Sequence, residues 1–256
     1  MSNLMQVAIL IAIPVVATVV GAAVAVRRQP GPKLISGVQH FTAGVVLAAV
    51  AGEVLPSLKE EGHLGWAVLG FLAGIGLVLV LETVSEREKA HEQKILKGLI
   101  PRAAKAALPL GMLIPVAVDL LMDGILVGLG ASLGMTQAII LTVALTLEVL
   151  FLGVSLVAVL REGGQTPGRA VLWCFLVSLA MVVGAFGGVL LLGGAGKEVM
   201  AFALAFGAAA LLYLAVEELL LEAHENAETP LLTAMFFVGF IVIYVLAEVG
   251  SGMTIF

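Results

Sequence analysis

The segment Val116-Ala-Val-Asp119-Leu-Leu-Met-Asp123-Gly124 lies inside a long apolar run and carries two carboxylates four residues apart. On a helix, this spacing places Asp119 and Asp123 on one face, about 6 Å apart. The next apolar run carries a third acid, Glu148, followed five residues later by Gly153. An acid near the middle of a membrane helix costs about 3 kcal/mol or more, so it usually faces a bundle interior or an aqueous path. These three acids therefore predict a cation-binding site where the two helices meet.

The composition is that of an integral membrane protein. Of the 256 residues, 61% are hydrophobic and only 12% are charged, and the mean hydropathy is +1.16. A soluble domain of this length is about one quarter charged. The net charge of −5 does not suggest nucleic-acid binding, because many of the acids lie within apolar runs. The single cysteine, Cys174, excludes an intrachain disulfide.

Eight apolar runs reach the roughly 20 residues that a helix needs to span a bilayer. They cover residues 4–26, 34–58, 64–86, 108–132, 135–160, 170–194, 199–223 and 231–254. Most connections are short, so the sequence predicts an all-α fold in which one membrane domain, residues 1–256, forms an eight-helix bundle. No basic segment precedes the first run, which is expected to remain as a helix and not to be cleaved as a signal. Close helix packing is expected at six glycines spaced in fours: Gly70, Gly74, Gly124, Gly128, Gly184 and Gly188.

Basic residues give the expected orientation in the plasma (bacterial inner) membrane. All but two of the 13 Lys and Arg residues follow the first, third or fifth run, and only Lys59 and Lys197 lie on the opposite side. Because positive charge concentrates on the cytoplasmic side, the charged connection 86–107 is expected to be cytoplasmic, and partly helical. Both termini are then extracytoplasmic.

Four of the runs carry local patterns around their polar residues. The second contains Ala43-Gly44 and ends in Glu53-Val-Leu-Pro56, and the fourth and fifth each place a glycine after their acids. The seventh contains Tyr213-Leu-Ala-Val-Glu217-Glu218 and continues to Glu222-Ala-His224. In order and depth, these patterns resemble those of the ZIP family of divalent metal transporters, particularly its bacterial branch. The resemblance covers essentially the whole chain and implies a carrier that moves divalent cations toward the cytoplasm.

The chain departs from the family pattern at the metal ligands. The family's H-N-x-P-D/E-G falls on residues 119–124, and its H-E-x-P-E-G falls on residues 148–153, so that acids stand at both histidine positions. The two glutamates of the second motif are replaced by Val149 and Leu152. The binuclear site that the resemblance would imply is therefore reduced to three carboxylates, and one metal position is expected to be lost.

An oxygen-only site limits the chemistry that can be expected. Carboxylates suit Mg²⁺, Mn²⁺ and Ca²⁺ and tolerate Fe²⁺, whereas Zn²⁺ usually takes histidine or cysteine as well. Three carboxylates in a low-dielectric interior would either hold a metal or share protons, which suits a carrier that exchanges protons for metal. The expected cargo is a Zn, Mn, Fe or Cd divalent cation, which is a transported substrate, and no prosthetic cofactor is expected.

Other polar residues are candidates along the path. Glu53 is either an entrance ligand or an ordinary interfacial acid, and one of Glu217 and Glu218 is expected to face the path as an exit ligand. His40 and His224 are expected to be interfacial, with a role at the exit as the alternative for each of them. For Asp119 and Asp123, the structural alternative is a pair of protonated acids that hydrogen-bond between helices.

Three functions remain open at this stage. The first is the ZIP-like carrier, whose partners are the divalent metal ion and the lipid bilayer, with a homodimer as the candidate assembly. The second is a ZIP-like protein that has lost transport and serves as a sensor, a scaffold or a carrier of another solute, as the missing histidines and prolines suggest. The third is an intramembrane aspartyl protease. It is disfavoured because both aspartates lie on one helix, so the chain is not expected to be an enzyme.

Overall fold

The computed structural model describes residues 3–28, 30–98, 110–224 and 229–250, and almost all of them are helical. The elements are α1 (Asn3–Arg27), α2 (Pro32–Ala49), η1 (Val50–Val54), α3 (Leu55–Glu61), α4 (Leu64–Gly98), α6 (Leu110–Leu133), α7 (Met135–Glu162), α8 (Pro167–Leu192), α9 (Lys197–Tyr213), η2 (Leu214–Leu220), α10 (Leu221–His224) and α11 (Pro230–Gly250). No strand occurs within these ranges. The prediction of an all-α fold is therefore confirmed.

Within the described residues, eight helices are long and apolar enough to cross a membrane. They correspond one by one to the eight predicted runs. The main difference is that α4 continues beyond residue 86 to Gly98, so the first part of the charged connection 86–107 is helical as expected. The remainder of that connection, and residues 108–109 and 251–254 of the predicted runs, lie outside the described residues.

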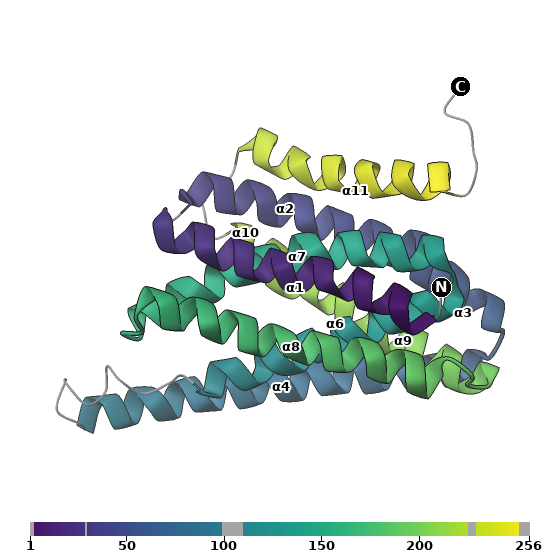
Figure 1. Ribbon diagram of the computed structural model, residues 1–256, viewed down its shortest axis with the longest axis horizontal. Coiled ribbons are helices and arrows are strands. Elements are labelled where there is room, and N and C mark those ends of the chain that lie inside the picture. The colour runs from purple at the N-terminus through teal and green to yellow at the C-terminus, as the bar shows by residue number, and fades with distance from the viewer. Residues whose placement is uncertain (1–2, 29, 99–109, 225–228, 251–256) are drawn as a thin grey trace.

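The helices run roughly along one direction, with the start of α1 and the end of α11 at the same end of the bundle (Figure 1). The last turns of α4 extend beyond the opposite end. This arrangement fits an even number of crossings. That the end with the termini is extracytoplasmic remains a prediction from the basic residues.

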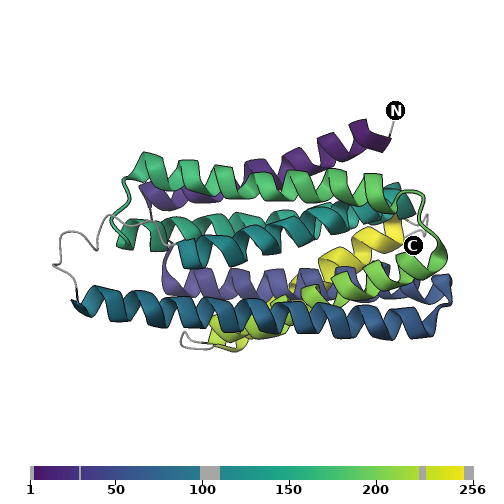
Figure 2. The same ribbon diagram turned by 90° about the horizontal axis from the view of Figure 1, so that it is seen from below.

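Two groups of four spans make up the bundle. In the first group, α1, α6, α7 and α8 pack on one another, while the second consists of the pairs α2–α11 and α4–α9. The two groups form layers, with α1 and α8 on one side and α4 on the other (Figure 2). The apolar windows of α4 and α11 are only 17% and 11% buried, against 50% for those of α6 and α7. α4 and α11 therefore present most of their apolar surface outward, as a lipid-facing helix does.

Glycines set the close approach of α6 to α8. A Cβ added to Gly124 would collide with the backbone carbonyl of Met181, and one added to Gly184 would collide with that of Leu121. The contact is thus reciprocal and leaves no room for any larger residue. The other predicted glycines meet partner backbone in the same way: Gly70, Gly74, Gly128 and Gly188. The packing role expected from their spacing is confirmed.

The same device holds α7 against α1. A Cβ on Gly153 would collide with the carbonyl of Thr18, and one on Gly21 would collide with that of Leu150. Gly153 follows Glu148 by little more than one helical turn. The acids of α6 and α7 are therefore carried by helices whose outer faces are locked to α8 and α1, and their inner faces meet each other.

Candidate metal site

Asp119 and Asp123 of α6 and Glu148 of α7 lie together in the bundle. Each offers one carboxylate oxygen, and these three oxygens lie within 4.8 Å of one another. Asp123 and Glu148 are 3% and 4% exposed, while Asp119 is half-buried. The structure thus brings together the three residues that the sequence placed at one depth, and it does so at the contact between the two helices. We refer to them as the acidic cluster.

Two oxygens of the acidic cluster are not satisfied by the protein. Asp123 Oδ2 and Glu148 Oε2 are buried and find no hydrogen-bond partner among the residues that the structure describes. A buried polar atom without a partner is costly, and most such atoms in proteins are hydrogen-bonded. Acids that served only to link helices would be expected to use these oxygens. A cation between them would satisfy both at once.

A cavity of about 80 Å³ adjoins the acidic cluster. One water needs about 10–15 Å³ measured in this way, so a partly hydrated cation can be accommodated. Its walls come from α2, α6, α7 and η2, namely Gln39, Asp119, Glu148, Phe151, Leu152, Ser155, Leu214, Glu218 and Leu219. Phe151 and Leu152 occupy the positions where the family motif has a proline and a glutamate, and they give the cavity an apolar side.

Three further polar side chains, Gln39, Ser155 and Glu218, line this cavity. Glu218 also lies close enough to Asp123 and Glu148 to interact with them electrostatically. Of the two inner glutamates, Glu218 is thus the one that faces the cavity, and Glu217 is not among its lining residues. Gln39 and Ser155 were missed by the sequence analysis, because an amide or a hydroxyl in an apolar run is common and gives no signal.

Both segments that carry the outlying glutamates are π-helical. Glu53 lies in η1, and Glu217 and Glu218 lie in η2. Such wide turns are rare and occur frequently at functional sites. Glu53 is not part of the acidic cluster, because it lies about 20 Å along the helix from Gln39. Its side chain is buried, and it interacts electrostatically with Glu248 of α11.

His40 is only 1% exposed, because α10 packs against α2 next to it, where Ser36 hydrogen-bonds to the carbonyl of Ala223. An interfacial depth for His40 stays a prediction. His224, which ends α10, is exposed, but its ring lies next to that of His40.

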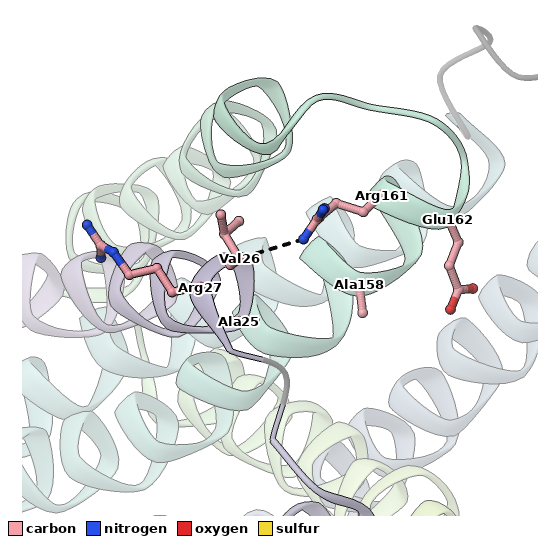
Figure 3. Close-up of a pocket in the computed structure, with 6 residues that line it drawn as sticks. All are labelled: Ala25, Val26, Arg27, Ala158, Arg161 and Glu162. Carbon is pink, nitrogen blue, oxygen red and sulfur yellow. Dashed lines mark hydrogen bonds between the residues drawn. The ribbon is translucent and has the colours of Figure 1, made fainter.

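A larger cavity, of about 440 Å³, lies away from the acidic cluster where α1 and α7 end (Figure 3). It is lined by Ala25, Val26, Arg27, Ala158, Arg161 and Glu162. Arg161 donates a hydrogen bond from Nη1 to the carbonyl of Val26 at 3.4 Å, whereas Arg27 and Glu162 point away. The lining of this cavity carries two arginines and one glutamate, so it lacks the group of acids that a divalent cation would need.

Comparison with known proteins agrees with this architecture. The family model for the ZIP zinc transporters matches residues 83–247, which is more than half of the chain. The zinc transporter ZupT of Corynebacterium efficiens is 29% identical over 219 residues, which cover 80% of this chain and 82% of that protein. ZupT of Corynebacterium aurimucosum is 27% identical over 225 residues, which cover 82% and 84%. The chain therefore belongs to the bacterial branch of the ZIP family, and it is a multi-pass membrane protein of the divalent metal transporter class.

Proposed function

We propose that this protein carries divalent cations across the plasma membrane toward the cytoplasm, and that Asp119, Asp123 and Glu148 hold the cation midway. The observation that carries the proposal is the meeting of three carboxylate oxygens within 4.8 Å, on two membrane-spanning helices. Three ionised acids so close together repel strongly in a low-dielectric interior. A divalent cation offsets two of the charges, and a proton on the third acid completes neutrality. The acidic cluster can then alternate between a metal-bound and a protonated form, which is what exchange of metal for protons requires.

The path on either side uses the outlying glutamates. We assign Glu53 to the entrance, and Glu218, with Glu217 beside it, to the inner side. Glu218 supports this order because it lines the same cavity as Asp119 and Glu148. The π-helical turns that carry these acids have a looser hydrogen-bond ladder than an α-helix, so they are suited to local rearrangement as the cation passes.

The ligand atoms favour harder cations than zinc. Oxygen-only sites suit Mn²⁺ and Fe²⁺, while Zn²⁺ and Cd²⁺ bind better where nitrogen or sulfur ligands are available. The relatives named above are zinc transporters. We propose that this chain shares their transport but shifts the preference from zinc toward Mn²⁺ and Fe²⁺.

A second function, metal sensing without transport, has one observation in its favour. Phe151 and Leu152 place apolar side chains in the wall of the cavity, where the family motif has a proline and a glutamate. A wall of this kind slows the movement of a cation without preventing its binding. Binding and transport must therefore be measured separately.

The deciding experiment uses the purified protein in liposomes that contain a metal-sensitive dye, with parallel calorimetric titrations of Mn²⁺, Fe²⁺, Zn²⁺ and Cd²⁺. We expect both binding and uptake, and loss of both in Asp123→Asn. The matched control is Glu198→Gln, which removes an exposed acid at the start of α9, far along the chain from the acidic cluster. Binding without uptake would favour the sensor. Absence of binding at millimolar concentration of every metal would refute the proposal.

A further inference from the structure

Two histidines far apart in the sequence come together where α10 packs on α2. The ring centroids of His40 and His224 are 5.1 Å apart, and the ring planes are inclined by 56°. A hydrogen bond of 2.9 Å from Ser36 Oγ to the carbonyl of Ala223 joins the two elements directly beside the rings. Because this bond links a buried side chain to the backbone of a fully buried residue, the proximity of the rings is fixed by the fold.

Both rings are oriented in the same way by backbone carbonyls. His40 Nδ1 lies 2.9 Å from the carbonyl oxygen of Ser36, and His224 Nδ1 contacts that of Leu220. A carbonyl oxygen can only accept a hydrogen bond, so each Nδ1 must carry the proton. In a neutral imidazole, the lone pair is then on Nε2. This is the arrangement of histidines that bind metals, which almost always donate their other N–H to a carbonyl, a carboxylate or a water.

The Nε2 atom of His40 is the independent observation that points to a ligand. It is buried in a side chain that is only 1% exposed, and it finds no hydrogen-bond partner among the described residues. A buried acceptor without a donor loses its hydration without compensation. An imidazole that served only as packing would not need this atom, and a phenylalanine would fill the space without the cost.

The distance between the rings suits one shared metal ion. With a metal–nitrogen bond of about 2.0–2.1 Å and a ring nitrogen about 1.2 Å from its centroid, two imidazoles on a tetrahedral ion have centroids ~5.2 Å apart. The observed separation is 5.1 Å. Only one side of such a site would be dry, because His224 is exposed, and water can take the remaining positions.

We propose that His40 and His224 form a second metal site, which binds Zn²⁺, Co²⁺ or Ni²⁺ through two imidazole nitrogens and water. Nitrogen donors favour these ions over Mn²⁺, Mg²⁺ and Ca²⁺, so the site has the opposite preference to the acidic cluster. Its position suggests a role. Gln39, the neighbour of His40, lines the cavity beside the acidic cluster, and α10 lies toward the end of the bundle away from the termini (Figure 1). The proposal of a metal site at His40 and His224 does not depend on the proposed transport. A role for this site as the last binding site before the cytoplasm does depend on the proposed transport.

The test is a calorimetric titration of tag-free protein in which the acidic cluster has been disabled by Asp119→Asn, Asp123→Asn and Glu148→Gln. In this background we expect one Zn²⁺ per chain, with Mn²⁺ bound at least about tenfold more weakly. Adding His40→Gln or His224→Gln should weaken Zn²⁺ binding at least about tenfold. Adding His63→Gln should change nothing, because this histidine lies in the connection between α3 and α4.

Several outcomes would overturn the site. One is a background that binds no Zn²⁺, and another is Zn²⁺ affinity that survives the loss of either histidine. A melting temperature lowered by both variants with unchanged affinity would assign the rings to packing. If the buried His40→Gln variant does not fold, the exposed His224 supplies the test. Failure here leaves the acidic cluster untouched, because that proposal is judged by uptake in liposomes and by Asp123→Asn in the otherwise natural chain.

Discussion

Asp123 and Glu148 face each other from neighbouring helices, both almost wholly buried, and each keeps one oxygen without a hydrogen-bond partner among the described residues. Two acids in this relationship destabilise the fold unless something positive lies between them. The consequences can be measured, because stability and metal affinity respond to a lost charge in opposite directions.

Asp123→Asn should weaken metal binding at least tenfold, about 1.4 kcal/mol, without unfolding the protein. The metal-free form should be as stable as before or more stable, since one repulsive charge is removed from a crowded site. Melting temperature and affinity are to be measured on the same preparation. If Asp123→Asn and Glu148→Gln both melt early and yet bind metal normally, the acids have a structural role.

The double variant Asp119→His with Glu148→His should move the preference toward zinc. It supplies two nitrogen donors at the positions where the family motifs have histidine, and zinc favours such mixed sites. Competition titrations of Zn²⁺ against Mn²⁺ measure the change. An unchanged order of metals would show that these two residues are not ligands.

Glu218→Gln should reduce uptake severalfold more than Glu217→Gln. The two residues are adjacent in η2, but only Glu218 is among the residues that line the cavity beside Asp119 and Glu148. Uptake in liposomes at several metal concentrations measures the difference. If both variants reduced uptake equally, lining the cavity would not explain which of the two glutamates takes part in transport.

Gly124→Ala should destabilise the protein, by about 1–3 kcal/mol, because its methyl group would collide with the carbonyl of Met181. The shift of α6 should also lower metal affinity, since Asp123 is the preceding residue. The matched control is Gly187→Ala in α8, where an added Cβ meets nothing within 4 Å. Thermal unfolding of both variants in one detergent provides the comparison. A control as unstable as Gly124→Ala would refute the packing argument.

The orientation is tested by labelling single cysteines in a Cys174→Ser background. A cysteine at Leu96, in the last turns of α4, should be protected from an impermeant reagent applied to intact cells. A cysteine at Gly194, in the turn between α8 and α9, should be labelled, because an added Cβ there meets only open space. The reversed pattern would invert the orientation and place the termini in the cytoplasm.

The sequence was sufficient for the features that depend on one helix at a time. Hydropathy predicted eight spans, because each must bury about 20 apolar residues in lipid regardless of its neighbours. The spacing of Asp119 and Asp123 placed both on one face by helical geometry alone. Glu148 could be added to them because an acid at that depth needs a polar environment, and the nearest one lies on the preceding helix.

Features that depend on how helices rotate against each other could not be predicted. Gln39 reaches the cavity, and His40 meets His224, only because of the angle at which α2 faces η2 and α10. The π-helical segments Val50–Val54 and Leu214–Leu220 differ from an α-helix in their backbone hydrogen-bond pattern. Their amino-acid composition does not reveal this difference.

The division of the bundle into two groups has a mechanical consequence. All three acids belong to the group of α1, α6, α7 and α8, whose members are held by glycine contacts, whereas Gln39 and Glu218 belong to the opposite group. If one group moved along the other, a cation bound by the acidic cluster would stay with its three carboxylates. Only the residues of the opposite group that face the cation would change, so these residues would decide where it is loaded and where it is released.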